Sequence, residues 1–175
     1  MEEVEPVERA EEDIHDKARE SRERWVMGVA LTAAILAAVA AIAASLSSHH
    51  ESECVLDQIK ASDQWAYYQA KGIKENTAAL EARILQAIGK PSAETEGSER
   101  YQKEKEEIRS KAEALTEASE RHMTLHRTFS RTVTLSQIGI AVAAVSVLTK
   151  KRPFWFVSMC FGAAGLYFLA RGLAG

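Results

Sequence analysis

Residues 25–46 form an uninterrupted stretch without a charged side chain, WVMGVALTAAILAAVAAIAASL. About 20 apolar residues in an α-helix are enough to cross the hydrocarbon core of a bilayer. Trp25 lies at the start of the stretch, where an indole ring suits the headgroup interface. Its many alanines let helix backbones approach closely in lipid. The stretch therefore predicts a transmembrane helix that packs against other helices, and it makes a membrane protein the leading expectation.

Two shorter apolar segments follow near the C-terminus, at residues 132–149 and 153–171, and the basic turn Lys150-Lys151-Arg152 lies between them. Each is close to the lower length limit for spanning, about 17 residues. We expect a second and a third transmembrane helix, with an amphipathic or re-entrant pair as the alternative. Ser136 and Gln137 are polar side chains near the start of the second segment.

Residues 1–24 are acidic at first and basic just before the first apolar stretch. A secretory signal peptide has the opposite order, with positive charge at its start and a small-residue cleavage site at its end. We expect a solvated tail, partly helical or disordered. The alternative is an interaction tail.

Residues 47–131 are highly charged and predict a long helical arm. Its first half carries a heptad stripe, which is typical of coiled-coil packing. The stripe consists of Leu56, Ile59, Asp63, Ala66, Ala70, Ile73, Thr77, Leu80, Ile84 and Ala87. Asp63 and Thr77 interrupt its apolar character. Either these polar residues fix register or oligomer size, or the seam drifts and Asp63 points to water.

Residues 89–98 predict a turn, because Gly89 and Pro91 are helix stop signals. A second charged helix is expected from about residue 99 to 131, with one apolar face that includes Ile108, Ala112 and Phe129. Two such helices would form an antiparallel hairpin. Because neither has a wide apolar face, the arm needs partners, most simply copies of itself. The predicted fold is an all-α membrane protein with three transmembrane helices and a long extramembrane, coiled-coil-like helical hairpin.

The composition argues against several function classes. With 22 Lys+Arg, 25 Asp+Glu and a net charge of −3, the chain lacks the concentrated positive charge that nucleic-acid binding requires. Its two cysteines, Cys54 and Cys160, form no metal or redox motif. No nucleotide-binding or hydrolase motif is present. We therefore expect neither an enzyme nor a cofactor.

An aromatic cluster, Trp65, Tyr67 and Tyr68, lies on the first arm helix. It could anchor a partner or serve ordinary packing between helices, and a subunit contact suits it best. The predicted interaction residues are Leu56, Ile59, Asp63, Trp65, Ala66, Tyr67, Tyr68, Ala70, Ile73, Leu80 and Ile84.

His122 and His126 are four residues apart, a spacing used by helical zinc pairs. The hairpin would bring them near His49, His50 and Cys54. A metal-binding or proton-sensing cluster is conceivable, but two unrelated interfacial histidines are the simpler interpretation, so no metal site is predicted.

Basic residues predict the orientation. Lys17, Arg19, Arg22 and Arg24 precede the first span, and residues 150–152 separate the other two. The positive-inside rule then places the N-terminus in the cytoplasm and the arm outside. Arg121, Arg127 and Arg131 count against this orientation, but the charges of a long loop weigh less.

The stretch Lys60–Asn76, and above all the string SDQWAYYQAK at residues 62–71, resembles a bacterial family of uncharacterised membrane proteins, domain of unknown function four-three-three-seven. The resemblance covers most of the chain from about Trp25 onward. It implies a three-span bacterial membrane protein and supplies no activity. With the orientation above, we expect a bacterial inner membrane protein with a cytoplasmic N-terminus and a periplasmic arm.

The leading functional hypothesis is a non-enzymatic scaffold or accessory subunit in contact with membrane lipid. It would self-associate through its arm, and a larger membrane complex that contains it is also conceivable. The first alternative is a ring-forming channel with Ser136 and Gln137 near its pore. The further alternative is a metal- or pH-responsive sensor that uses His122 and His126.

Overall fold

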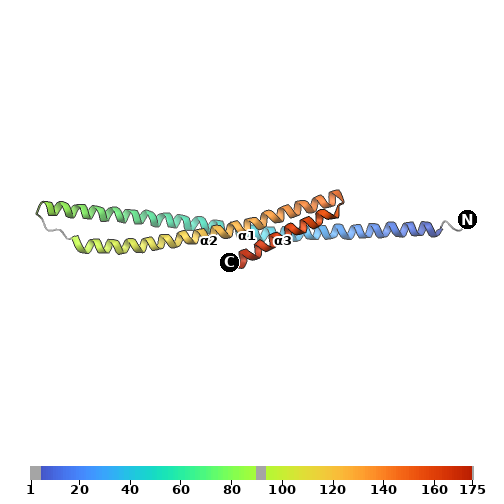
Figure 1. The fold of residues 1–175 in the computed structure, drawn as a ribbon, viewed down its shortest axis with the longest axis horizontal. Helices are drawn as coiled ribbons and strands as arrows, with labels where there is room; N and C mark the ends of the chain where they lie inside the picture. Colours follow the sequence, from blue (N-terminus) through green and yellow to red (C-terminus); the bar gives the residue numbers. More distant parts are fainter. Residues whose placement is uncertain (1–4, 90–93, 175) are drawn as a thin grey trace. The chain divides into compact units, whose positions relative to one another are not determined.

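A computed structural model describes the backbone of residues 5–89 and 94–174, and the side chains of residues 19–89 and 100–174. Three α-helices account for nearly all of this part: α1 (Glu5–Ala87), α2 (Glu94–Thr149) and α3 (Arg152–Ala174) (Figure 1). The described residues contain no strand, so the all-helical fold class is confirmed. The chain divides into two compact units: unit 1 holds residues 1–47 and 127–175, and unit 2 holds residues 48–126.

Helix α1 begins well before the first apolar stretch. Residues 5–24, for which the sequence predicts a solvated and only partly helical tail, are helical throughout. The physical reason is the absence of helix breakers, since no proline or glycine occurs between Pro6 and Gly28. Proline is tolerated in the first turn of a helix, so Pro6 does not prevent the early start.

The link between α1 and α2 is shorter than the predicted turn at 89–98. Helix α1 ends at Ala87, and Gly89 adopts the left-handed conformation with φ 71°. The Gly89 N–H donates to the Gln86 carbonyl oxygen at 3.1 Å, as in a glycine-terminated helix. Helix α2 already begins at Glu94, because Gly97 is the one strong helix breaker in its first five residues and a single glycine costs only about 1 kcal/mol.

The link between α2 and α3 is tighter still. Lys150 adopts the left-handed conformation with φ 55°, although it has a side chain. Its N–H donates to the Val147 carbonyl oxygen, and the Lys151 N–H donates to the Ser146 carbonyl oxygen, each at 3.2 Å. These two bonds form a Schellman motif, which satisfies the last carbonyls of α2. Pro153 then lies in the first turn of α3, where its missing N–H is harmless.

Unit 1 packs its helices through small residues. The buried Ser158 hydroxyl of α3 donates to the Gly139 carbonyl oxygen of α2 at 2.7 Å. The buried Leu36 side chain of α1 fills the space beside Gly139 and Gly162, where added Cβ atoms would lie 2.9 and 2.7 Å from its methyl groups. The indole N–H of Trp155 donates to the Thr32 hydroxyl of α1 at 3.2 Å. Glycine and serine thus allow the close backbone approach that suits helices in lipid.

Each of the three helices contains a stretch long and apolar enough to cross a membrane, judged by length and composition alone over the described residues. The coarser part of the predicted architecture, three apolar helices of spanning length, is therefore confirmed.

In unit 2, residues 48–87 of α1 lie beside residues 94–126 of α2 and run in the opposite direction (Figure 1). Cross-helix contacts follow this order, from His50 with His122 at one end to Glu75 with Lys105 further along. The apolar core between the segments is thin and consists largely of Cys54, Ala61, Ala82, Ile108 and Ala112.

Candidate functional site

The heptad stripe of α1 points away from α2. Its large apolar side chains keep about half or more of their surface exposed, with Ile73 at 66%, Ile84 at 62% and Leu80 at 57%. Asp63, Ala66 and Ala70 on the same stripe are also exposed. The exposed apolar side chains of this face of unit 2 are Val55, Leu56, Ile59, Tyr67, Ile73, Leu80, Ile84 and Ile88. We call this set the exposed stripe.

Helix α2 covers a different face of α1, made of small and polar residues. Cys54 and Ala61 are buried there, and Gly72 brings its backbone close to the Lys105 side chain. The Ser119 hydroxyl of α2 donates to the Cys54 carbonyl oxygen at 3.1 Å. Small residues permit close approach and polar groups find partners across the contact. The more apolar face of α1 is therefore left outside.

The aromatic cluster is divided between the two faces. Trp65 and Tyr68 are half-buried toward α2 and contact each other edge-to-face, with ring centroids 5.7 Å apart. Tyr67 lies on the exposed stripe and is 51% exposed.

The two polar residues of the heptad stripe make no contact with the described residues of α2 that could set its register. The Thr77 hydroxyl donates to the Ile73 carbonyl oxygen of its own helix at 2.9 Å, and Asp63 is exposed.

Two reciprocal ion pairs join the helices of unit 2 instead. Lys71 of α1 pairs with Glu104 of α2, and Lys105 of α2 pairs with Glu75 of α1 at 2.8 Å. The hydrogen bond from Lys71 lowers the pKa of Glu104, and the hydrogen bond from Lys105 lowers the pKa of Glu75. The sequence analysis did not find these pairs. The sequence could have indicated them, because Lys71 and Glu75 lie about as far before the turn as Glu104 and Lys105 lie after it, and an antiparallel hairpin brings such positions together.

The structure brings His122 to His50, as the hairpin topology predicts for this end of the arm. Their Nδ1 atoms lie 2.9 Å apart, so one ring donates a hydrogen bond and the other accepts it. Burial, followed by the charge of His122, lowers the pKa of His50; His49 and His126 add to this effect, while Glu53 opposes it. Within the described part of the chain, no group of three or more His, Cys, Asp or Glu side chains is arranged to hold a metal ion.

The polar residues of the second apolar segment lie on different faces. Ser136 is fully buried, and its hydroxyl would lie 3.2 Å from a Cβ at Gly165 of α3. Gln137 is exposed. Ser136 therefore contributes to packing within the protomer, and only Gln137 of the predicted pore pair reaches the surface.

The fold and these surfaces define an all-helical protein with three apolar helices of spanning length and an exposed helical stripe. The chain belongs to the family described as Domain of unknown function (DUF4337), whose sequence model matches residues 25–175. No curated protein and no solved structure matches the chain.

Proposed function

We propose that this protein is a non-enzymatic membrane scaffold or accessory subunit, and that copies of it associate through the exposed stripe. The observation that carries the proposal is the exposure of Ile73, Leu80 and Ile84 after α2 has packed on α1. The stripe runs from Val55 to Ile88, roughly 50 Å of helix. An exposed apolar stripe of this length on a charged segment, interrupted by Asp63 and Thr77, is typical of an interaction site.

A second copy of the same chain fits this stripe better than an unrelated surface. The residues repeat at alternating spacings of three and four, so the stripe of one copy can interdigitate with that of another as knobs into holes. In a parallel pairing, the flanking positions place Gln69 opposite Lys74, Asn76 opposite Glu81, and Arg83 opposite Ile88. At these flanking positions no like charges face each other, whereas Asp63 on the heptad stripe itself would lie opposite Asp63 of the second copy. Copies anchored in one membrane with the same orientation would meet in this parallel direction.

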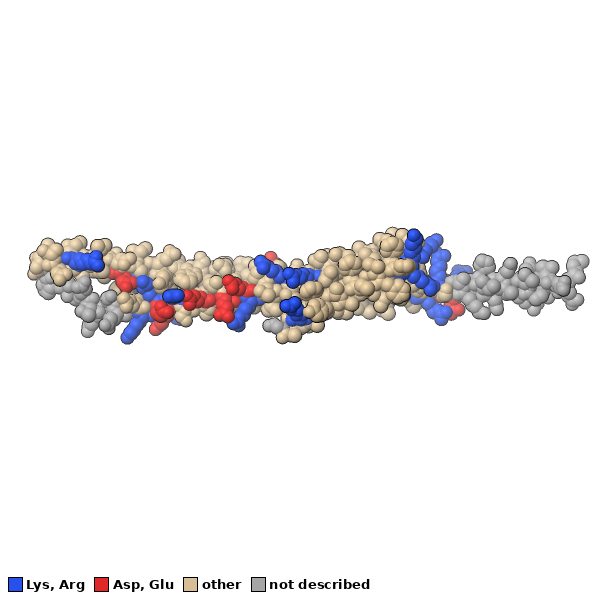
Figure 2. Space-filling view, in the orientation of Figure 1, with Lys and Arg blue, Asp and Glu red and all other residues tan. Residues whose placement is uncertain are grey.

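The membrane part of the proposal has two supports. The three apolar helices have the length and composition of spans. Unit 2 carries numerous charged side chains along its length (Figure 2) and so suits an aqueous compartment. We propose a bacterial inner membrane, a cytoplasmic N-terminus and a periplasmic position for unit 2, on the positive-inside rule applied to Arg19–Arg24 and residues 150–152.

Disulfide crosslinking tests the proposed contact. In a Cys54→Ala, Cys160→Ala background, Ile73→Cys places a thiol on the stripe, and parallel in-register pairing would bring the thiols of two copies together. We expect oxidation of membranes containing this variant to give a covalent dimer. Ser110→Cys, an exposed position on α2 in the same unit, is the matched control and should remain monomeric. Equal crosslinking of both variants, or of neither, would contradict the proposed contact.

The histidine pair supports a second candidate function, an acid response of the arm. Two protonated rings at His50 and His122 would direct N–H groups and positive charge toward each other, because their Nδ1 atoms are only 2.9 Å apart. The charged neighbours that face His50 are His49 and Glu53 on α1, and His122 and His126 on α2. Acid would then loosen this end of unit 2. Mass measurements of the solubilised protein across the range around the ordinary histidine pKa test the idea, and an unchanged mass and helicity would reject it.

A further inference from the structure

The proposed scaffold role does not use the basic residues at one end of unit 1. Six cations gather there: Arg19, Arg22, Arg24, Lys150, Lys151 and Arg152. We call this set the basic collar. Figure 2 shows Lys and Arg side chains grouped at one end of the uncharged surface of unit 1.

Contacts between α1 and α3 explain why the arginines of α1 and the basic residues 150–152 lie at the same end of unit 1. The Trp155 ring would lie 3.5 Å from a Cβ at Gly28, and its indole N–H donates to the Thr32 hydroxyl. Trp155 follows Arg152 by three residues, and Gly28 follows Arg24 by four. The next contact along, Leu36 with Gly162, shows that α1 and α3 run in the same direction.

Four of the six collar cations have no acidic partner among the side chains that the structure describes, residues 19–89 and 100–174. Arg19 and Arg24 form only exposed pairs with Glu23 and Glu20, at 3.5 and 4.0 Å. Among the described residues, the exposed Arg22, Lys150, Lys151 and Arg152 have no acidic side chain within 4 Å. Concentrated positive charge of which only part is paired attracts an anion from outside.

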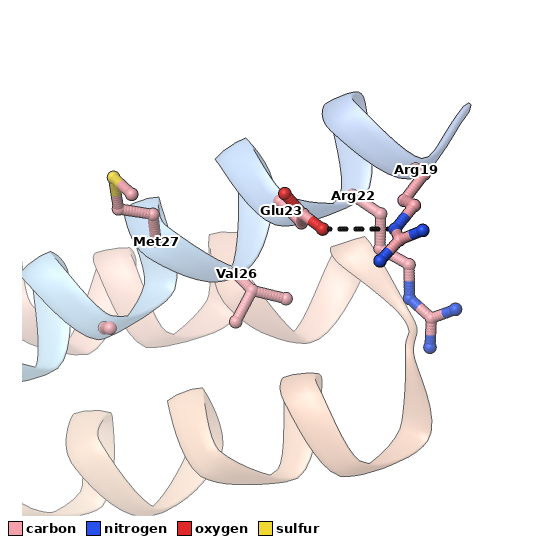
Figure 3. Close-up of a pocket in the computed structure, with 6 residues that line it drawn as sticks. Arg19, Arg22, Glu23, Val26 and Met27 are labelled. Carbon is pink, nitrogen blue, oxygen red and sulfur yellow. Dashed lines mark ion pairs between the residues drawn. The ribbon is translucent and has the colours of Figure 1, made fainter. Parts of the chain in front are cut away.

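A groove on α1 identifies what kind of anion fits. It is open, has a volume of about 560 Å³, and is lined by Arg19, Arg22, Glu23, Val26, Met27 and Ala30. In Figure 3 the two guanidinium groups lie at one end of this groove and the Met27 side chain lies at the other. An anion with an apolar tail matches this gradient better than a free phosphate does, because Val26, Met27 and Ala30 begin the apolar stretch.

From this arrangement we infer that the basic collar binds the phosphate headgroup of an anionic phospholipid, with an acyl chain along Val26, Met27 and Ala30. The inference rests on the membrane placement in the proposed function, but it does not depend on self-association. It assigns the collar a specific ligand, whereas the positive-inside rule uses the same residues only to set orientation.

Lipid retention tests the inference. The full chain is reconstituted in vesicles of equal parts phosphatidylglycerol and phosphatidylcholine, then solubilised, and its bound lipids are counted by native mass spectrometry. We expect enrichment of phosphatidylglycerol that falls as salt is raised. Each neutralised cation should lower the enrichment about fivefold, the factor corresponding to about 1 kcal/mol per basic residue.

The test variant is Arg22→Gln with Lys150→Gln and Lys151→Gln. The control is Lys103→Gln with Lys111→Gln, two exposed cations of unit 2, which should bind lipid like the wild type. Equal retention of both lipids by the wild type would overturn the inference even if the collar variant fails to fold, and so would a folded collar variant that keeps its enrichment. Excess inorganic phosphate should leave the lipid bound, and displacement would assign the collar to free phosphate instead.

The same spectra separate this inference from the scaffold proposal. A monomer enriched in phosphatidylglycerol would contradict only self-association, and an oligomer without enrichment would contradict only the lipid site. A protein that alkaline carbonate extracts from membranes would contradict the membrane placement on which both depend.

Discussion

At the scale of single residues, polar side chains make specific contacts between the two segments of unit 2. His50 meets His122 at one end, Ser119 bonds to the backbone of Cys54, and Glu75 pairs with Lys105 further along. Polar contacts are directional, so they specify one register more strictly than small apolar residues can. They also make the stability of unit 2 depend on pH.

We predict that unit 2 loses stability as the pH falls below about 6.5, the ordinary pKa of histidine. The pKa of His50 is lower in the folded protein than in the unfolded chain. The unfolded chain therefore takes up the proton first, and stability is lost as pH falls toward the lowered pKa. Thermal unfolding followed by circular dichroism measures the effect. His122→Gln should flatten this step while His49→Gln largely preserves it, and an unchanged step in His122→Gln would contradict the role of the pair.

We also predict that the Glu75–Lys105 pair fixes the register of α1 against α2. Either Glu75→Lys or Lys105→Glu places two like charges across the contact and should lower the unfolding temperature of unit 2. The double variant restores opposite charges and should recover most of the loss. The intrahelical Arg109–Glu113 pair is the control, because an exposed pair four residues apart contributes little. If the double variant were as unstable as the sum of both single variants, the pair would have no such role.

At the scale of helices, sequence patterns located the elements better than they located their partners. The apolar stretch at 25–46 and the stop at Gly89 depend on local properties, length and backbone conformation, which a sequence displays directly. The face of α1 that contacts α2 does not. The heptad stripe is its most regular pattern, yet α2 packs on Cys54, Ala61 and Gly72, because close approach and cross-helix polar partners are properties of two segments together.

The same limit applies to the candidate sites. His122 was found from its spacing to His126, and the predicted hairpin brings it near His49, His50 and Cys54, but only the structure shows that its ring is hydrogen-bonded to His50. Ser136 and Gln137 are neighbours in sequence and were considered together, yet only the structure shows that α3 covers Ser136. The early start of α2 at Glu94 was missed because the polar residues after the stop signals Gly89 and Pro91 were interpreted as a turn that extends to residue 98.

Packing in unit 1 gives a prediction at the scale of helices. Gly162→Ala would bring a Cβ within 2.7 Å of the Leu36 side chain. That side chain is buried, and its other methyl group lies against Gly139. Because Leu36 has little room to move, we expect a destabilisation of about 1–3 kcal/mol, measured as a lower unfolding temperature in detergent.

The control for this prediction is Gly72→Ala, whose Cβ would come no closer than 3.8 Å to Lys105 and whose alanine favours the helix. Adding Leu36→Ala to Gly162→Ala should cost less than the sum of the two single changes. Full additivity would show that the two residues do not compete for space.

At the scale of the whole molecule, the protein combines three helices that contain apolar stretches of spanning length with a charged segment, residues 48–126 of unit 2, which carries the exposed stripe. Burial of apolar surface contributes roughly 25 cal/mol per Å². On the proposed function, the stripe would favour association of copies, because their contact would bury the apolar side chains that packing within one chain leaves exposed.

The mass of the solubilised protein tests the central claim most directly. We predict that the wild-type chain, purified in a mild detergent, has the protein mass of two or more chains of 19.3 kDa each. Ile73→Glu with Leu80→Glu should reduce it to one chain, because each copy would bring two further carboxylates into the seam, and burying a charge without a partner costs free energy. Ile73→Leu and Ser110→Glu should keep the wild-type mass. A wild-type particle of 19.3 kDa at every protein concentration would contradict the account, as would an oligomer that the double variant leaves intact.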